Sequence, residues 1–378
     1  MNKYLQKNYA LFNKEVKADR GFSDSIKKVA KNSTNQYILF GIIMCIVGFL
    51  ATEKIIPDII PYSWQSAFAI TFTYAIASIG FCLLMGYSGL ASLGTGGCIG
   101  IGTYAVHYIM VEAKLPLSVA IIVAIAVAIV LGLVIGFISL RIEGIYLVIL
   151  TLALSEILIT VYKASPFPKI ELKRMYALVF GQKLPDTMKL AFVMVFLVII
   201  MIITTNLIKS PTGRAMLAMK NSTAAAQAMG ISLIKYRLMA FVISTVYAAI
   251  TGVLMMMVVG SADATDATGC YALITSLNIL AAVIIGGYKS IWGAVFGTFV
   301  MFGIETIVFQ VVFKKLFEQN EALKDTIPLI ITLASGVLVI VIAMFFPGGL
   351  AQLLTELKFK ISKLFKKMKE AKYGKDLG

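Results

Sequence analysis

Long apolar runs separated by short polar segments fill the chain from residue 37 to residue 346. A membrane-spanning helix needs about 20 mostly apolar residues, because the hydrocarbon core of a bilayer is about 30 Å thick. The pattern therefore predicts an all-α polytopic membrane bundle of about ten helices. We expect spans near residues 37–52, 64–85, 96–111, 117–139, 145–162, 190–207, 237–258, 271–286, 291–312 and 327–346.

Two polar segments flank the apolar region. The sequence predicts a cytoplasmic N-terminal segment at residues 1–36, a transmembrane domain at 37–347 and a basic tail at 348–378. In the tail, apolar residues recur at helical spacing with lysines between them, which is typical of a helix lying on an anionic membrane surface. These residues are Leu357, Ile361, Leu364, Phe365 and Met368.

Composition and charge support a membrane protein. The chain is 59% hydrophobic and 14% charged, whereas soluble domains carry about 25% charged residues. Its formal net charge of +15 predicts attraction to membrane lipid, and not to nucleic acid, because no soluble domain is available to form a binding groove. Most Lys and Arg residues fall on the inner side if both termini are cytoplasmic. The lysine-rich loop 163–189 is the exception to this N-in, C-in orientation.

The sequence lacks the motifs of catalytic or metal centres. The four cysteines stand singly in or beside apolar runs, with no CxxC spacing, and we interpret them as packing residues. The sequence has no GxxxxGK[ST] phosphate loop and no HExxH motif. We interpret His107, its single histidine, as an interfacial polar residue near the outer end of a helix. We therefore predict no cofactor, no metal and no enzymatic activity in this chain.

A glycine-rich segment begins at Gly86 and reads Gly-Tyr-Ser-Gly-Leu-Ala-Ser-Leu-Gly-Thr-Gly-Gly to residue 97, continuing through Gly100 and Gly102. Each glycine in a helix costs about 1 kcal/mol relative to alanine. Two interpretations remain open on physical grounds. The glycines allow either tight helix packing or an unwound backbone at membrane depth, within a broken or re-entrant helix at 96–111, that exposes polar groups to a solute.

A long polar connection follows at residues 210–237. Ser222 or Thr223 can cap a short alanine-rich helix, and Gly230 is a natural stop. Such a helix suits insertion into a cleft of a partner protein. An ordinary loop is the alternative, although structureless loops of this length are uncommon.

Two glutamates lie within predicted spans. Carboxylates at membrane depth are costly and usually face the bundle interior or a water-filled path. For Glu156 we favour a path-lining role, and for Glu305 a packing role.

Six segments in order resemble the permease subunits of branched-chain amino acid ABC importers, whose wider family also serves sugars, nucleosides and urea. The resemblance runs from about Gly86 to Leu350. Its pieces are Gly86–Gly94, Leu140–Leu147 with Thr151 and Glu156, Gly213–Met216 with Ala224–Ala226 and Gly230, Tyr236–Phe241, Gly286–Gly293 and Phe346–Leu350.

The resemblance implies a type II-like importer in a bacterial or archaeal plasma membrane. Its partners would be two cytoplasmic ATPase subunits, a second permease that is identical or homologous, and an external solute-binding protein. Coupling to an ATPase would involve Gly213, Arg214, Ala225, Ala226 and Gly230. The translocation path would involve Tyr87, Gly89, Gly94, Gly96, Thr151, Glu156 and Asn278.

Two departures from the family pattern concern the solute. Asn278 stands where the family often has a glutamate, and loop 163–189 lacks the usual Thr-Gly-Gly stretch. Branched-chain or other amino acids are the expected solutes, with urea or amides, nucleosides and sugars as alternatives. An ion-coupled secondary transporter is the alternative from another class, but it would need a cluster of ion ligands within the membrane. A membrane-embedded enzyme would need a catalytic constellation.

Overall fold

A computed structural model of the chain describes residues 33–52, 62–139, 144–171, 178–179, 182–183, 188–265 and 269–303. Most of the predicted N-terminal segment lies outside these residues. So do the tenth predicted span, Glu305 and the basic tail, together with the part of the ninth predicted span beyond residue 303.

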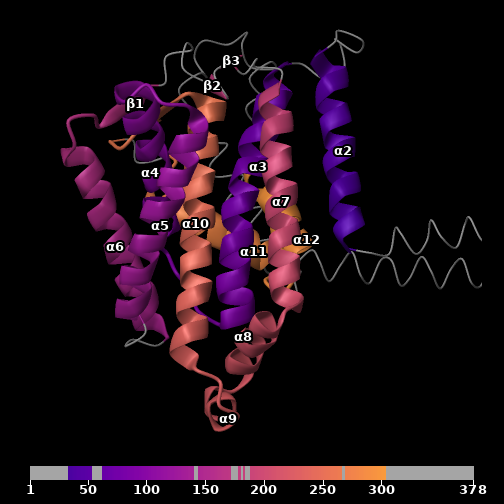
Figure 1. The fold of residues 1–378 in the computed structure, drawn as a ribbon, viewed down its shortest axis with the longest axis vertical. Coiled ribbons are helices and arrows are strands. Elements are labelled where there is room, and N and C mark those ends of the chain that lie inside the picture. Colours follow the sequence, from indigo (N-terminus) through magenta and orange to yellow (C-terminus); the bar gives the residue numbers. More distant parts are fainter. Residues whose placement is uncertain are drawn as a thin grey trace, which may run out of the picture.

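The described chain is almost entirely helical (Figure 1). The long helices are α2 (Ser33–Thr52), α3 (Tyr62–Leu83), α5 (Leu117–Ser139), α6 (Ile145–Ala164), α7 (Lys189–Lys209) and α10 (Leu233–Val259). Shorter ones are α4 (Thr95–Val106), α8 (Pro211–Asn221), α9 (Thr223–Ala228), α11 (Leu273–Gly286) and α12 (Ile291–Thr298). π-Helical turns include η1 (Leu84–Ser88) and η2 (His107–Glu112), and residues 299–303 after α12 are also π-helical.

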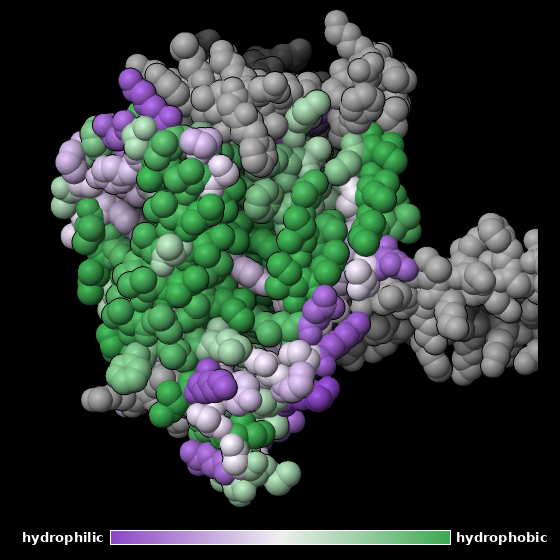
Figure 2. Space-filling view, in the orientation of Figure 1, coloured by the Kyte–Doolittle hydropathy of each residue, from purple (hydrophilic) through white to green (hydrophobic). Residues whose placement is uncertain are grey.

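Five helices of the described chain are long and apolar enough to cross a membrane: Gln65–Ser88, Leu117–Ile138, Ile145–Ala164, Lys189–Lys209 and Leu233–Val259. Shorter apolar helices lie at Thr34–Ile46, Leu273–Gly286 and Ile291–Gly303. Figure 2 shows a broad hydrophobic surface across the middle of the molecule, with hydrophilic residues gathered toward its ends. This surface matches the hydrocarbon region of a bilayer, and the prediction of a helical membrane bundle is confirmed.

The helices divide into an inner and an outer set. In the most apolar stretch of 18 residues in α3, 83% of the residues are buried within the protein. In the corresponding stretches of α5 and α6 the buried share is 28%. Helix α4 is the most enclosed, because only Ala105 among its residues is not fully buried. It contacts α5, α6, α10 and α11. Residues of the glycine-rich segment therefore lie inside the bundle.

Small residues bring α4 and α10 into direct backbone contact. A methyl group added to Gly102 would collide with the carbonyl oxygen of Ala249, and one added to Gly252 would collide with that of Ile99. Such close approach is a common means of packing helices in membranes, where burial from water does not drive association. For the part of the glycine-rich segment that lies in α4, the glycines therefore serve tight helix packing.

Short strands join two loops at one end of the bundle. Strand β1 (Lys169–Glu171) pairs antiparallel with β4 (Ser261–Asp263), so that Ile170 lies opposite Ala262 and is fully buried. Strands β2 (Leu178–Val179) and β3 (Gln182–Lys183) pair antiparallel in the same loop as β1. Helices α8 and α9 project from the opposite end (Figure 1). The loops after α6 and α10 therefore share a side of the membrane that α8 and α9 do not.

An ion pair and a turn secure the contact between β1 and β4. The Lys169 ammonium lies 3.1 Å from the Asp263 carboxylate. The Thr265 hydroxyl and backbone N–H also donate hydrogen bonds to that carboxylate, and these bonds, more than Lys169, hold the pKa of Asp263 below its usual value.

One expectation for the segment at 96–111 needs correction. The helix is regular from Thr95 to Val106, and the interruption lies before it, at residues 89–94. Hydroxyl groups that cap the start of α4 make this earlier break possible, as described below. His107, interpreted from the sequence as an interfacial polar residue, is buried by its neighbours. It is 5% exposed, its ring packs 4.7 Å from that of Phe167, and neither ring nitrogen has a hydrogen-bond partner in the described part of the chain.

Candidate functional site

Residues 89–94 form a non-helical crossing between α3–η1 and α4. Gly89 ends η1 with a φ of 75°, and its N–H donates to the Leu84 carbonyl. This left-handed conformation is the usual way to stop a helix, and glycine adopts it without steric cost. Gly94 then caps the start of α4. The chain thus contains an irregular segment between two buried helices, and its backbone polar groups need partners.

Helix α6 supplies hydroxyl partners for this segment. The Leu93 N–H donates to the Thr151 hydroxyl at 3.0 Å, and the Gly97 N–H donates to the Ser155 hydroxyl at 2.9 Å. Thr151 and Ser155 lie four residues apart and therefore share one face of α6. This face bonds the irregular segment and the first turn of α4.

A second hydroxyl comes from α11. The Gly96 N–H donates to the Ser276 hydroxyl at 2.7 Å, and the Gly94 N–H donates to the Ser92 hydroxyl at 3.2 Å. The first N–H groups of a helix have no partners within the helix. Side chains far apart in the sequence satisfy them here, which allows α4 to begin inside the bundle.

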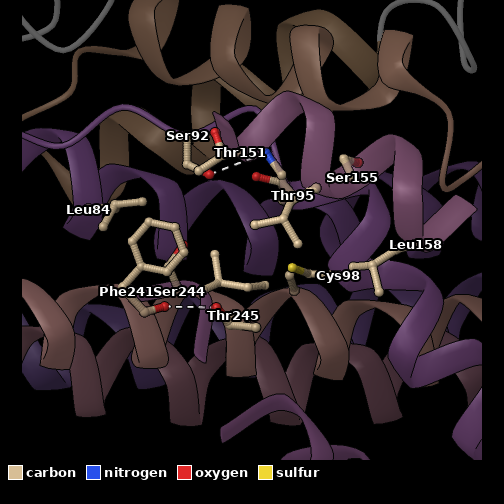
Figure 3. A pocket seen from close by; sticks show the side chains of 14 residues that line it. Leu84, Ser92, Thr95, Cys98, Thr151, Ser155, Leu158, Phe241, Ser244 and Thr245 are labelled. Atoms are coloured by element: carbon tan, nitrogen blue, oxygen red, sulfur yellow. Dashed lines mark hydrogen bonds between the residues drawn. The ribbon is translucent and has the colours of Figure 1, made fainter. Parts of the chain in front are cut away.

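A small hydroxyl-rich cavity lies beside the start of α4 (Figure 3). It has room for about one water molecule. None of the lining residues is charged. They are Leu84, Ser92, Gly94, Thr95, Cys98, Ile135, Thr151, Leu154, Ser155, Leu158, Phe241, Ser244, Thr245 and Ala248.

The cavity combines an apolar wall with polar groups at one edge. Hydroxyls line it beside a helix start, whose partial positive charge favours anions such as carboxylates. Apolar side chains such as Leu158 and Phe241 complete the wall. An amino acid side chain of several carbons needs more space than one water. The described conformation is therefore closed to such a solute, and helices would have to separate to admit it.

Seven residues were predicted to lie along the path, and the structure brings only some of them together. Gly94 and Thr151 line the cavity, and Gly96 lies behind it against Ser276. The others lie elsewhere: Tyr87 and Gly89 at the end of η1, Asn278 half-buried on α11, and Glu156 with its side chain exposed on α6.

Sequence reasoning missed most of the lining hydroxyls. Three of them lie beside residues that were predicted for the path: Ser92, Thr95 and Ser155. The other two, Ser244 and Thr245, lie in the predicted span 237–258, which contains no predicted site residue. A signal was present, because Thr151 and Ser155 repeat at helical spacing within an apolar run. Serine and threonine are common in membrane helices and bond their own backbone, so this signal is weak.

Replacing Thr151 by valine should destabilise the protein by about 1–3 kcal/mol, because the buried Leu93 N–H loses its partner while the side chain keeps its shape. Thermal unfolding of the purified protein in detergent measures this loss. Thr160→Val on the same helix is the matched control, since the exposed Thr160 hydroxyl donates only to the Glu156 carbonyl of α6. Equal melting temperatures for the two variants would contradict the assigned role of Thr151.

Helices α8 and α9 form a projection at one end of the bundle. Ser222 caps α9, and its hydroxyl accepts the Ala225 N–H at 3.3 Å. Gly230 follows the helix with a φ of 77°. The predicted cap and stop are therefore confirmed. Met229 is 82% exposed beside them, so the tip of the projection presents an apolar side chain to its surroundings.

Five residues were predicted to couple to an ATPase, and they divide between the tip and the base of this projection. Ala225 and Gly230 are exposed at the tip, whereas Ala226 is buried beneath it. Gly213 is buried in the first turn of α8, where a side chain would collide with the Ile208 carbonyl. Arg214 is exposed beside it and donates to the Lys209 carbonyl at 3.3 Å.

The model of a transporter family matches residues 65–350, and its description is branched-chain amino acid transport system permease component. The chain belongs to this family. The match covers the described bundle from α3 onward. The resemblance inferred from the six sequence segments is confirmed, and the permease is a multi-pass protein of the cell membrane.

Two curated relatives carry the same kind of name. The permease is 25% identical over 248 residues to the high-affinity branched-chain amino acid transport system permease protein LivM of Salmonella typhimurium, covering 58% of this chain and 57% of LivM. It is 25% identical over 249 residues to LivM of Escherichia coli, covering 58% of each chain. The aligned part is thus less than two thirds of either relative. No solved structure matches the permease significantly.

Proposed function

We propose that this chain is the membrane-spanning subunit of an ATP-binding cassette importer that moves amino acids, with branched-chain amino acids as the first candidates. The family match over residues 65–350 carries this proposal. The exposed, capped helix α9 supports it, because it offers a rigid contact for a separate ATPase. An external binding protein would deliver the solute, and a second permease would complete the membrane unit of about ten spans per chain with both termini inside.

The proposed mechanism requires no covalent chemistry in this chain. ATP binding would draw two ATPase subunits together, and α9 would transmit the motion to the bundle through α8. The bundle would then alternate between openings on the two sides of the membrane, as expected of an importer.

The cavity chemistry favours amino acids over the alternative solutes. The partial positive charge at the start of α4 favours a carboxylate nearby, although hydroxyl groups already accept its Gly96 and Gly97 N–H groups. The apolar residues Leu154, Leu158 and Phe241 suit an aliphatic side chain. Urea, nucleosides and sugars lack the carboxylate.

The position of Glu156 supports a proposal for where the translocation path runs. Its side chain is exposed at the middle of α6, among residues such as Ile149 and Ile157 that are also exposed. A carboxylate facing lipid at this depth is costly. We therefore infer that this face of α6 meets water or another protein. A water-filled path between two permease chains would provide both.

Replacing Glu156 by glutamine should lower uptake or alter its pH dependence, while assembly of the complex stays close to normal. The reason is that glutamine keeps the shape and loses the charge. Labelled amino acid uptake by proteoliposomes across a pH series measures the first effect, and size-exclusion chromatography measures the second. Glu171→Gln is the control, since Glu171 is exposed on β1. Normal uptake and an unchanged pH profile would overturn the path-lining role.

The proposed function is tested by reconstituting the complete complex in vesicles with its ATPases and binding protein. Labelled leucine, isoleucine and valine should accumulate only with ATP, and unlabelled urea, nucleosides and sugars should not compete. Concentrative uptake by this chain alone, driven by a proton or sodium gradient, would instead identify a secondary transporter.

A further inference from the structure

Lys220 lies where three elements meet. It is half-buried near the end of α8, and its ammonium group donates to the carbonyl oxygens of Met85 at 3.2 Å and of Gly86 at 2.7 Å. The same group lies 4.5 Å from the centre of the Tyr288 ring, in the turn between α11 and α12. One side chain from the projecting helix pair thus holds both η1 and this turn.

The contacts suit a cation at a helix end. The last carbonyl groups of a helix have no partners within it and carry partial negative charge. Lys220 supplies charge-assisted hydrogen bonds to two of these groups, and the face of Tyr288 gives a cation–π contact. Partial burial, together with the positive charge of Lys289, lowers the pKa of Lys220. The carbonyls of Met85 and Gly86 therefore replace part of the water around the ammonium group.

The turn between α11 and α12 packs against the same end of η1. The Tyr87 hydroxyl donates to the Lys289 carbonyl at 2.9 Å, and the Cys82 thiol donates to the Tyr288 carbonyl at 3.3 Å. A side chain at Gly86 would collide with the Tyr288 carbonyl. Since η1 and the turn are in backbone contact, Lys220 bonds to a preformed unit.

This unit continues directly into the cavity. Segment 89–94 leaves the end of η1, and Ser92 and Gly94 line the cavity a few residues after Gly86. In the other direction, Lys220 stands two residues before Ser222, the cap of α9. A short physical connection therefore runs from the exposed tip to the cavity wall, and Lys220 forms its central polar contact.

We propose that Lys220 is a positioning residue that couples movement of α8 and α9 to the position of segment 89–94 beside the cavity. The inference rests on the proposed function, because it requires an ATPase that moves α9. Displacement of α8 pulls on the carbonyl end of η1 through the ammonium group. The π-helical turn is the element that changes, because such turns are local interruptions of helical geometry found at functional sites.

The first test measures coupling in the assembled transporter. For K220M, ATP hydrolysis should continue, while the amount of labelled amino acid imported per ATP hydrolysed should fall about tenfold. K220R should retain most of the coupling, since guanidinium also donates to carbonyls. K235M is the control, because Lys235 is exposed at the start of α10 and lies outside this junction. A wild-type import ratio for K220M would overturn the proposal.

The second test needs no transport. In the isolated permease in detergent, amide hydrogen exchange should rise in K220M across residues 85–94 and stay unchanged in α6, and K220R should restore protection. Unchanged exchange across 85–94 in K220M would overturn the role of Lys220 whatever the solute proves to be. Failure of the proposed function would appear separately, as a wild-type complex that imports none of the amino acids.

Discussion

Replacing Gly102 by alanine should destabilise the permease by about 1–3 kcal/mol, the usual cost of overpacking a core. The added methyl group would collide with the Ala249 carbonyl, which is backbone and cannot rotate away. The sign is informative, because the same substitution in an unconstrained helix interior stabilises the helix by about 1 kcal/mol. Thermal unfolding of the purified protein in detergent measures the change.

Gly136→Ala is the matched control for this prediction. A methyl group added at Gly136 would meet a terminal carbon of the Leu238 side chain at 2.7 Å, and that side chain can move. Its melting temperature should stay near the wild-type value or rise. If Gly102→Ala were as stable as Gly136→Ala, the contact between α4 and α10 would be looser than described.

The apolar runs alone were enough to predict most of the bundle. The predicted span 117–139 corresponds to α5 (Leu117–Ser139), and 145–162 to α6 (Ile145–Ala164). This agreement has a physical cause, since a helix is the structure that satisfies all backbone hydrogen bonds of a single segment in lipid. The length and hydrophobicity of a segment are therefore enough to predict a membrane-spanning helix, even when its neighbours are unknown.

Local capping signals were also readable. Ser222 and Gly230 were predicted to begin and end a short helix, and α9 lies between them. The same reasoning should have found α8, because Ser210 is followed by Pro211 and the Ser210 hydroxyl accepts the Gly213 N–H. Serine before proline is a common helix start. The polarity of this segment instead favours a simple connection between spans.

The packing around the cavity could not be predicted in the same way, because it joins distant parts of the chain. Gly96 and Ser276 are 180 positions apart, and Lys220 and Gly86 are 134 apart. Neither pair leaves a periodic trace in the sequence. The direction of Glu156 was equally hidden, because α6 is apolar on most sides and its pattern does not distinguish an inner from an outer face.

Replacing Gly230 by valine should lower solute-stimulated ATP hydrolysis of the assembled transporter about tenfold, while the permease still folds. Gly230 has a φ of 77°, which a β-branched residue rarely adopts. The substitution adds about 1–3 kcal/mol of strain at the end of α9. Because no heavy atom lies within 4 Å of the added carbon, the strain is relieved by movement of the tip and leaves the core packing intact.

Gly230→Asn separates backbone conformation from side-chain bulk. Asparagine tolerates positive φ better than other residues with side chains, so this variant should keep most of the stimulated activity although it is also larger than glycine. Equal loss in both variants would mean that the surface at Gly230 itself touches the ATPase. Full activity in Gly230→Val, with normal melting temperature, would show that the conformation of α9 does not govern coupling. The proposal that α9 docks the ATPase would then fail, and the family assignment, which rests on residues 65–350 as a whole, would stand without it.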